Sequence, residues 1–144
     1  MYKRQLSFLS PAVQSPCEQF RYQSQNITEN QLIDCWQHIV NAQSNIPLSQ
    51  FEFKTLSALI LAKTLQVDVL ILEVGLGGQD DAVNIVDADV AILTHVGHDH
   101  IQFLGTCPLT RGRIKAGIFR AHCPAIVAQT NPPQTVVDLS LIHI

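Results

Sequence analysis

Two side chains that could bind a metal ion follow the ends of two apolar segments. Glu73 comes directly after residues 69–72, and a glycine-rich turn at 75–78 follows it. His100 lies a few residues beyond a second apolar segment, residues 89–93. Both segments are predicted to be strands of a parallel sheet, and the run before Glu73 is predicted to be buried on both faces. Open α/β sheets bind ligands at the carboxyl ends of their strands. A carboxylate oxygen and an imidazole nitrogen at one sheet edge could share a divalent cation.

Other interpretations of these residues remain open. Glu73 could cap a strand or pair with a basic residue, and His100 could be a hydrogen-bonded structural histidine. The histidines at 95, 98 and 100 suggest a metal-dependent hydrolase, although their spacing differs from its HxHxDH signature. A dinucleotide fingerprint at the glycine turn is weak, because Asp80 stands where the third glycine belongs. No GxxxxGK[ST] phosphate loop occurs in the chain.

Composition predicts one globular α/β domain. The chain has 144 residues, of which 47% are hydrophobic and 15% are charged, so it can bury a core. A net charge of -3 without a basic patch argues against nucleic-acid binding. No segment is typical of a membrane span. The four cysteines form no CxxC pair and are interpreted as reduced thiols of a soluble, cytosolic protein: Cys17, Cys35, Cys107 and Cys123.

The hydrophobic pattern predicts strands that alternate with helices, which is typical of parallel βαβ units. A helix is expected from the N-cap Thr28 to about residue 42, with Gln31 completing a weak capping box. Its predicted buried residues are Leu32, Trp36, Ile39 and Val40. Residues 11–30 are otherwise polar and irregular. Further strands are expected at 6–9, 67–74, 89–93 and 125–128, and further helices at 49–65 and 109–120, the last carrying Arg111, Arg113 and Lys115.

Several linked segments resemble the folylpolyglutamate synthase and dihydrofolate synthase family, within the Mur ligase superfamily. His100 lies 27 residues after Glu73 (100 − 73), and Lys115 lies 15 further on (115 − 100). The resemblance covers about residues 6–135. It is carried by Phe51-Glu52-Phe53-Lys54-Thr55, Glu73-Val74-Gly75-Leu76-Gly77-Gly78, Asp81-Ala82-Val83-Asn84-Ile85-Val86, Asp99-His100 with Phe103-Leu104-Gly105, and Lys115-Ala116-Gly117-Ile118-Phe119.

This resemblance implies an α/β fold: a partial three-layer parallel sheet with flanking helices, from the ATPase domain of a Mur-type ligase. The implied enzyme is cytoplasmic and monomeric. It uses ATP and Mg²⁺ to join L-glutamate to dihydropteroate or a reduced folate through an acyl phosphate. The runner-up hypothesis is a non-catalytic module that binds a pterin or a metal, and a metal-dependent hydrolase is the third.

The resemblance also implies roles for particular residues. Ser10, Glu73 and His100 would bind Mg²⁺, and Lys115 would be the carboxylated lysine of the family. Without the surrounding motif, Lys115 would be interpreted as an exposed helix cation, and Phe51 and Phe53 as core residues at a helix start. The segments implied to hold the pterin part of the substrate comprise Ser49, Gln50, Phe51, Glu52, Asp80, Asp81 and Ala82.

The chain also departs from the family pattern. Ala12, Gln79 and Ile114 replace a histidine, an arginine and a glutamate. The phosphate loop and the glutamate-binding C-terminal domain are expected to lie outside this chain, with residues 6–138 forming a partial ATPase domain. Residues 1–5 and 139–144, including His143, are expected to be non-native adaptor sequence. A polypeptide with these features is predicted to lack ligase activity by itself.

Overall fold

A computed structural model describes residues 3–142, with side chains up to residue 140. The chain divides into two compact units, Met1–Glu73 and Val74–Ile144. Glu73 ends the first unit, whereas His100 and Lys115 belong to the second. None of the helices in residues 3–142 is both long and apolar enough to cross a membrane.

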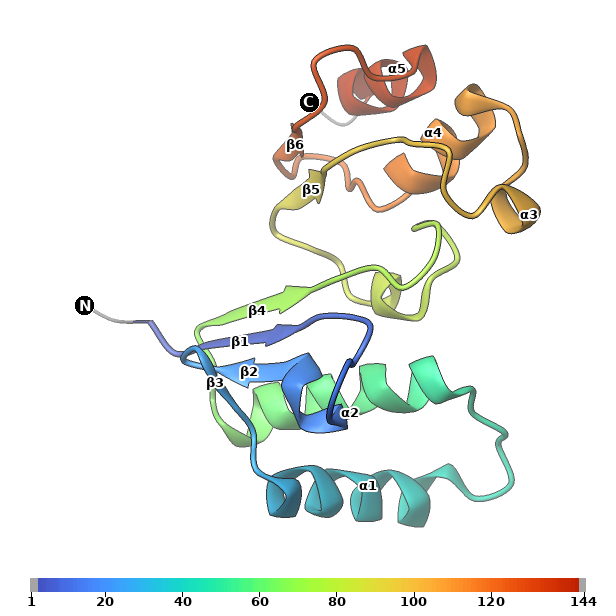
Figure 1. Ribbon diagram of the computed structural model, residues 1–144. Coiled ribbons are helices and arrows are strands. Elements are labelled where there is room, and N and C mark those ends of the chain that lie inside the picture. Colours follow the sequence, from blue (N-terminus) through green and yellow to red (C-terminus); the bar gives the residue numbers. More distant parts are fainter. Residues whose placement is uncertain (1–2, 143–144) are drawn as a thin grey trace. The chain divides into compact units, whose positions relative to one another are not determined.

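The first unit contains a four-stranded mixed sheet in the order β3-β2-β1-β4 (Figure 1). The strands are β1 (Gln5–Phe8), β2 (Phe20–Tyr22), β3 (Gln25–Asn26) and β4 (Val69–Leu72). β1 pairs with β4 in parallel and with β2 antiparallel, and β2 pairs antiparallel with β3. The sequence did not predict β2 and β3, because strands of two or three residues are too short to show a hydrophobic alternation.

Two helices cover one face of this sheet. α2 (Gln50–Thr64) lies between the sheet and α1 (Glu29–Gln43), and a short 3₁₀ helix, η1 (Pro16–Gln19), precedes β2 (Figure 1). α1 buries Leu32, Cys35 and Ile39, which follow one another at helical spacing. The prediction that Val40 is buried was wrong, since its exposed fraction is 55%. One residue beyond Ile39 the helix has turned by about 100° away from the buried face.

The core of the first unit forms around β1, where Leu6 and Phe8 are fully buried. Phe8 stacks on Phe20 at a centroid distance of 5.0 Å and packs against Phe51 of α2 at 5.6 Å. β4 was predicted to be buried on both faces, and this was wrong, because 42% of Ile71 is exposed. Phe8 is opposite Leu72 in the ladder, so alternation turns Ile71 to the face away from α2.

The second unit combines a parallel strand pair with short helices. Its elements are η2 (Ala82–Ile85), β5 (Ala91–Leu93), α3 (Ile101–Leu104), α4 (Pro108–Ala116), β6 (Ala125–Val127) and α5 (Gln134–Ile142). β5 and β6 pair in parallel, and α4 packs against α5 (Figure 1). The core residues are Ala91, Leu93, Val96, Ala116, Phe119 and Val136.

These elements confirm the predicted α/β class, with parallel pairing in both units. Two details differ from the prediction. Within the described residues, β4 and β5 belong to separate sheets, so the single sheet edge expected for Glu73 and His100 is not observed. The helix expected at 109–120 ends at Ala116, with Gly117 as its C-cap.

The ends that were predicted to be non-native take part in the structure where it is described. Gln5 belongs to β1, and Arg4 forms an ion pair with Asp68 at 3.0 Å, just before β4. Leu139 of α5 packs against the core of the second unit. His143 lies outside the described residues. The origin of both ends stays a prediction.

Candidate functional site

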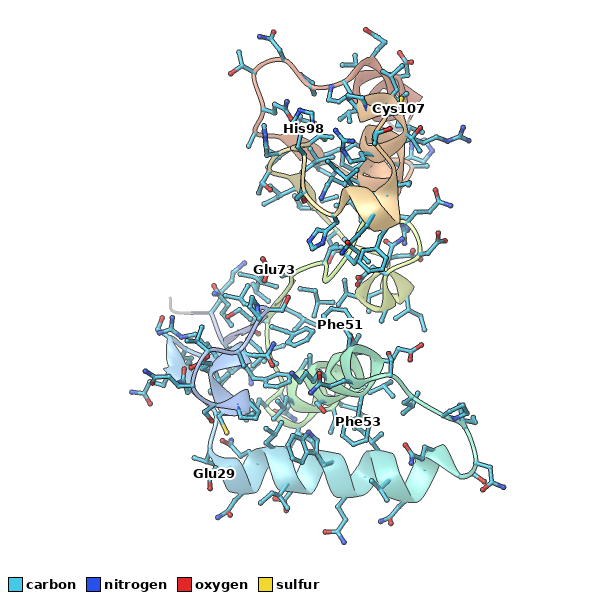
Figure 2. All side chains as sticks on the ribbon, turned by 45° about the vertical axis from the view of Figure 1, so that its right-hand side comes forward. Glu29, Phe51, Phe53, Glu73, His98 and Cys107 are labelled. Atoms are coloured by element: carbon cyan, nitrogen blue, oxygen red, sulfur yellow. The ribbon has the colours of Figure 1, made fainter. Side chains whose placement is uncertain are left out.

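Ser10 and Glu73 meet at the carboxyl ends of β1 and β4. The parallel register places Phe8 beside Leu72, so the residues that leave the two strands emerge together. The Ser10 N–H donates a hydrogen bond to Glu73 Oε2 at 2.6 Å, and the Glu73 N–H donates to the Phe8 carbonyl at 3.0 Å. Glu73 is exposed to solvent, and Figure 2 labels its side chain. The structure therefore brings together two of the three predicted metal ligands.

A buried glutamine holds the loop that carries Ser10. The Gln19 side chain donates from Nε2 to the Leu9 carbonyl at 3.1 Å, and the Leu9 N–H donates to the Gln19 carbonyl at 2.9 Å. Only 3% of Gln19 is exposed. In the same loop, the peptide bond between Ser10 and Pro11 is cis. Sequence reasoning missed Gln19, because a glutamine in an irregular polar segment carries no signal of burial.

His100, the third predicted ligand, lies in the second unit at the start of α3. Its backbone is left-handed with φ = 53°, and its carbonyl accepts hydrogen bonds from the N–H groups of Phe103 and Leu104 at 2.9 Å each. The His100 side chain is exposed. The histidines at 95 and 98 are exposed as well, and Figure 2 labels His98. Within residues 3–142, no three His, Cys, Asp or Glu side chains form a metal-binding group.

Lys115, on the last turn of α4, forms an ion pair with Asp99. Its Nζ donates to Asp99 Oδ2 at 3.3 Å, and 18% of the lysine side chain is exposed. Burial acts to raise the pKa of Asp99. Hydrogen bonds from its own N–H and from Lys115, together with the nearby positive charges, outweigh burial and lower this pKa overall. Asp99 therefore ionises at a lower pH than an isolated aspartate and pairs with Lys115 in this structure.

The glycine turn packs directly on the end of α4 that carries Lys115. A Cβ atom on Gly78 would lie 2.9 Å from the Lys115 carbonyl oxygen and 3.0 Å from that of Ile114. The Gln79 N–H donates to the same Ile114 carbonyl at 2.9 Å. Because Gly78 also has φ = 154°, this close approach of two backbones needs glycine. The turn thus fixes the backbone of Lys115.

Asp81 closes the glycine turn with both carboxylate oxygens. Oδ2 accepts from the Leu76 N–H at 2.9 Å, and Oδ1 accepts from the Val83 N–H at 3.0 Å. The second bond caps η2, which begins at Ala82. Asp80 is exposed. Asp81 therefore has a structural role whether or not it also contacts a substrate.

The other predicted substrate segment forms the start of α2. Ser49 and Glu52 make a reciprocal capping box: Ser49 Oγ accepts from the Glu52 N–H at 3.2 Å, and Glu52 Oε2 accepts from the Ser49 N–H at 2.7 Å. The hydrogen bonds from Ser49 lower the pKa of Glu52. Gln50 is exposed. Phe51 packs on Phe8, and Phe53 packs edge-on against Trp36 at 6.2 Å, which supports the core interpretation of both rings.

Arg111 is a further buried polar residue that the sequence did not reveal. It was predicted to lie on a helix beside Arg113 and Lys115, but only 1% of it is exposed. Its guanidinium donates from Nε to the Gly97 carbonyl at 2.9 Å and from Nη1 to the Gly105 carbonyl at 2.8 Å. Arg111 therefore contacts the loop that carries Asp99 and His100.

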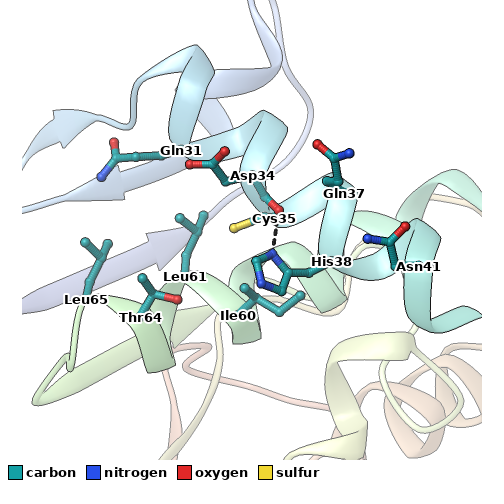
Figure 3. Close-up of a pocket in the computed structure, with 10 residues that line it drawn as sticks. All are labelled: Gln31, Asp34, Cys35, Gln37, His38, Asn41, Ile60, Leu61, Thr64 and Leu65. Carbon is teal, nitrogen blue, oxygen red and sulfur yellow. Dashed lines mark hydrogen bonds between the residues drawn. The ribbon is translucent and has the colours of Figure 1, made fainter.

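A separate pocket of about 330 Å³ lies between α1 and α2. Figure 3 shows His38 in this pocket, with Nδ1 at 2.7 Å from the Asp34 carbonyl oxygen. None of the predicted site residues lines it. The lining residues are Gln31, Asp34, Cys35, Gln37, His38, Asn41, Ile60, Leu61, Thr64 and Leu65.

Comparison with protein families identifies the class to which this fold and these residues belong. The Mur ligase middle domain matches residues 27–132. This range includes Glu73, His100 and Lys115, as well as both substrate segments. The α/β fold with its glycine turn is thus that of a Mur ligase middle domain.

Individual relatives define the family more closely. The chain is 46% identical over 133 residues to a dihydrofolate synthase/folylpolyglutamate synthase of Escherichia coli, covering 92% of this chain and 32% of that protein. The chain belongs to the dihydrofolate synthase/folylpolyglutamate synthase family of the Mur ligases. It is 52% identical over 91 residues to the Haemophilus influenzae protein of the same name, covering 63% of this chain and 21% of that protein.

Solved structures agree with this assignment. E. coli FolC in complex with DHPP and ADP matches with a TM-score of 0.93 and 44% identity, covering 96% of this chain and 34% of that one. The bifunctional Yersinia pestis enzyme, complexed with AMPPNP and a Mn ion, matches with a TM-score of 0.92 and 41% identity. That match covers 98% of this chain and 34% of that one. The chain thus spans about a third of the length of these relatives.

Proposed function

We propose that this chain forms part of an ATP-dependent ligase that adds L-glutamate to dihydropteroate, to reduced folates or to both. The observation that carries the proposal is the 46% identity to the E. coli dihydrofolate synthase/folylpolyglutamate synthase. The ligands of the solved relatives support the same chemistry. E. coli FolC was solved with DHPP and ADP, and the Y. pestis enzyme with Mn, AMPPNP and L-glutamate.

The donor set suits a divalent cation. Glu73 uses Oε2 to accept from Ser10, while in the described part of the chain no donor contacts Oε1. Carboxylate and hydroxyl oxygens suit Mg²⁺ and Mn²⁺, and imidazole nitrogen suits Mn²⁺ in particular. We propose that Ser10, Glu73 and His100 hold the ion. When bound, it would neutralise negative charge on the nucleotide phosphates.

The proposed reaction has two steps. A carboxylate oxygen of the pterin or folate substrate attacks the γ-phosphorus of ATP, and ADP leaves, giving an acyl phosphate. The amine of L-glutamate then attacks the acyl carbon, loses a proton and expels phosphate, which leaves an amide. Cationic groups that position the phosphates supply most of the catalysis in such transfers.

Lys115 and Asp99 bear on the charge of this site. Carboxylation of Lys115 needs the neutral amine, and in this structure the same nitrogen, Nζ, contacts Asp99 Oδ2 at 3.3 Å. We propose that Lys115 is carboxylated in the complete site, with the glycine turn fixing its backbone. We also propose that the complete enzyme is a monomer and that it works in the cytoplasm. The four free cysteines support a reducing compartment.

A chimera tests this function directly. The matching segment of the E. coli relative would be replaced by this chain, and glutamate-dependent formation of ADP would be measured with dihydropteroate. We expect the chimera to be active and Glu73→Gln in the chimera to lower kcat/KM at least about a hundredfold, with weaker Mn²⁺ binding. Glu29→Gln is the matched control, because Glu29 is an exposed glutamate in the first turn of α1 (Figure 2).

Other outcomes would point to the other hypotheses. A folded chimera that binds pterin or Mn²⁺ but forms no ADP would contradict the ligase and favour a non-catalytic module. Turnover of esters or phosphodiesters that is lost in His98→Ala would favour a metal-dependent hydrolase. Equal activity of Glu73→Gln and Glu29→Gln would refute the assigned role of Glu73.

A further inference from the structure

The guanidinium of Arg111 joins the two ends of one loop. The carbonyl groups that it contacts, Gly97 at 2.9 Å and Gly105 at 2.8 Å, bracket residues 98–104. This segment contains Asp99 and His100 and ends with α3. Two hydrogen bonds from one rigid group thus set the distance between the points where the loop leaves and rejoins the rest of the second unit.

We propose that Arg111 is a positioning residue for His100. By holding both ends of residues 98–104, it keeps His100 in the left-handed conformation from which α3 begins. The structural part of this inference stands on the second unit alone. Its consequence for metal binding rests on the function proposed above, in which His100 is a ligand.

The charge of Arg111 supports a specific role. Burying a guanidinium is costly unless its donors are satisfied, yet no ion pair within the described residues includes Arg111. Its identified acceptors are backbone carbonyl groups of the loop. An apolar side chain could fill the same core volume without this desolvation cost, so the loop contacts are what distinguish arginine here.

The backbone of the loop supports the same conclusion. His100 and Gly105 both have positive φ angles, of 53° and 81°. A left-handed conformation is unfavourable for a residue with a Cβ atom and persists where the surroundings hold it. α3 has only four residues, too few to be stable by itself. The contacts of Arg111 at both ends supply the constraint that the loop lacks locally.

Hydrogen exchange in the 144-residue chain measures this constraint. The N–H groups of Phe103, Leu104 and Gly105 report on the loop, because they donate to the carbonyl groups of His100 and Ile101. The N–H groups of Ala91 and Ala128 report on the β5–β6 pair of the same unit. A change in the first set without a change in the second identifies loosening of the loop rather than unfolding of the unit.

Arg111→Met keeps most of the side-chain volume but removes both hydrogen bonds. We expect exchange of the three loop amides to become at least about tenfold faster, with Ala91 and Ala128 unchanged. Arg111→Lys retains the charge, but one ammonium cannot reproduce the planar fork, so a smaller increase of about threefold is expected. Arg113→Met is the matched control, since Arg113 lies exposed on the same helix, and it should match the unmodified chain.

Two results would overturn the inference. One is loop exchange in Arg111→Met that equals that of the Arg113→Met control. The second applies if Arg111→Met loses protection from exchange throughout the second unit. In that case Arg111→Lys is the deciding variant, and exchange of its loop amides at the rate of the unmodified chain would overturn the inference. A separate NMR measurement tests the proposed metal role of His100: bound Mn²⁺ should broaden the signals of the His100 ring. If the loop loosens while Mn²⁺ never affects His100, the positioning role stands and the metal role fails.

Discussion

Glu73 and Lys115 illustrate how a side chain acquires its role from its immediate neighbours. Glu73 is exposed, and the Ser10 N–H orients one of its oxygens at 2.6 Å. Lys115 is half-buried and held by Asp99. Neither arrangement follows from the residue type alone, since a carboxylate at a strand end or a lysine on a helix is compatible with several partners. In this structure Ser10 contacts Glu73 through Oε2, and Lys115 pairs with Asp99.

At the same scale, the four cysteines are predicted to differ in reactivity. Hydrogen bonds from the Thr110 backbone and side chain, and from the Leu109 N–H, lower the pKa of the exposed Cys107. Burial raises the pKa of Cys35. A lower pKa means that the thiolate forms at lower pH, so iodoacetamide should modify Cys107 first near about pH 7. Peptide mapping by mass spectrometry after limited labelling checks this.

The control for the cysteine prediction is the same labelling in denaturant, where all four thiols should react at similar rates. Cys107→Ser should remove the fast-reacting fraction of the native protein. Faster labelling of Cys35 than of Cys107 in the native state would contradict the assignment.

At the scale of elements, helix caps connect sequence to structure most directly. The capping box predicted for Thr28 and Gln31 is confirmed, with both of its hydrogen bonds present. Ser49 and Glu52 form a second box at the start of α2. The sequence suggested these two residues as substrate contacts instead. Such side chains can form hydrogen bonds either with the free backbone groups at a helix end or with a ligand. In this structure they form them at the start of α2.

Substitution of Ser49 separates the two roles. Ser49→Ala should lower the free energy of unfolding by about 1 kcal/mol, whereas Ser49→Gly should cost only a few tenths, because glycine is tolerated at an N-cap. Urea denaturation of the chain measures both. Thr28→Ala is the control, since it removes the cap of α1, which has no predicted substrate role.

A substrate role of the Ser49 hydroxyl would show a different pattern. Alanine and glycine both lack the hydroxyl, so both variants would weaken folate binding equally in the chimera. Equal loss of stability in Ser49→Ala and Ser49→Gly would contradict the capping role.

At the scale of the whole molecule, the 144-residue polypeptide is predicted to have no ligase activity by itself. Its sequence contains no GxxxxGK[ST] loop to cradle the β- and γ-phosphates, and it spans about a third of the length of its relatives. Incubation with ATP, Mg²⁺, dihydropteroate and L-glutamate should form no product detectable by mass spectrometry, whereas the active chimera is the positive control. Product formation by the isolated polypeptide would contradict this prediction.

The α/β class and the types of the candidate site residues could be predicted because they depend on local patterns. Apolar runs predicted β1, β4, β5 and β6, and helical spacing predicted α1 and α2. The linked motifs around Glu73, His100 and Lys115 indicated a family that the comparisons confirmed. The strand and helix signals each lie within one continuous segment, where sequence and conformation are tightly coupled, and the family signal comes from the order and spacing of short motifs along the chain.

Only the tertiary structure identified the buried polar residues that support the loops. Gln19 and Arg111 are of types that are usually exposed, and their own segments give no indication of burial. Gln19 is buried against the end of β1, and Arg111 beneath the loop of His100. Burial and hydrogen bonding depend on which distant segments the fold brings together, and no local pattern encodes that. The sequence by itself thus determined the class and the candidate chemistry, and the fold determined what holds the residues in place.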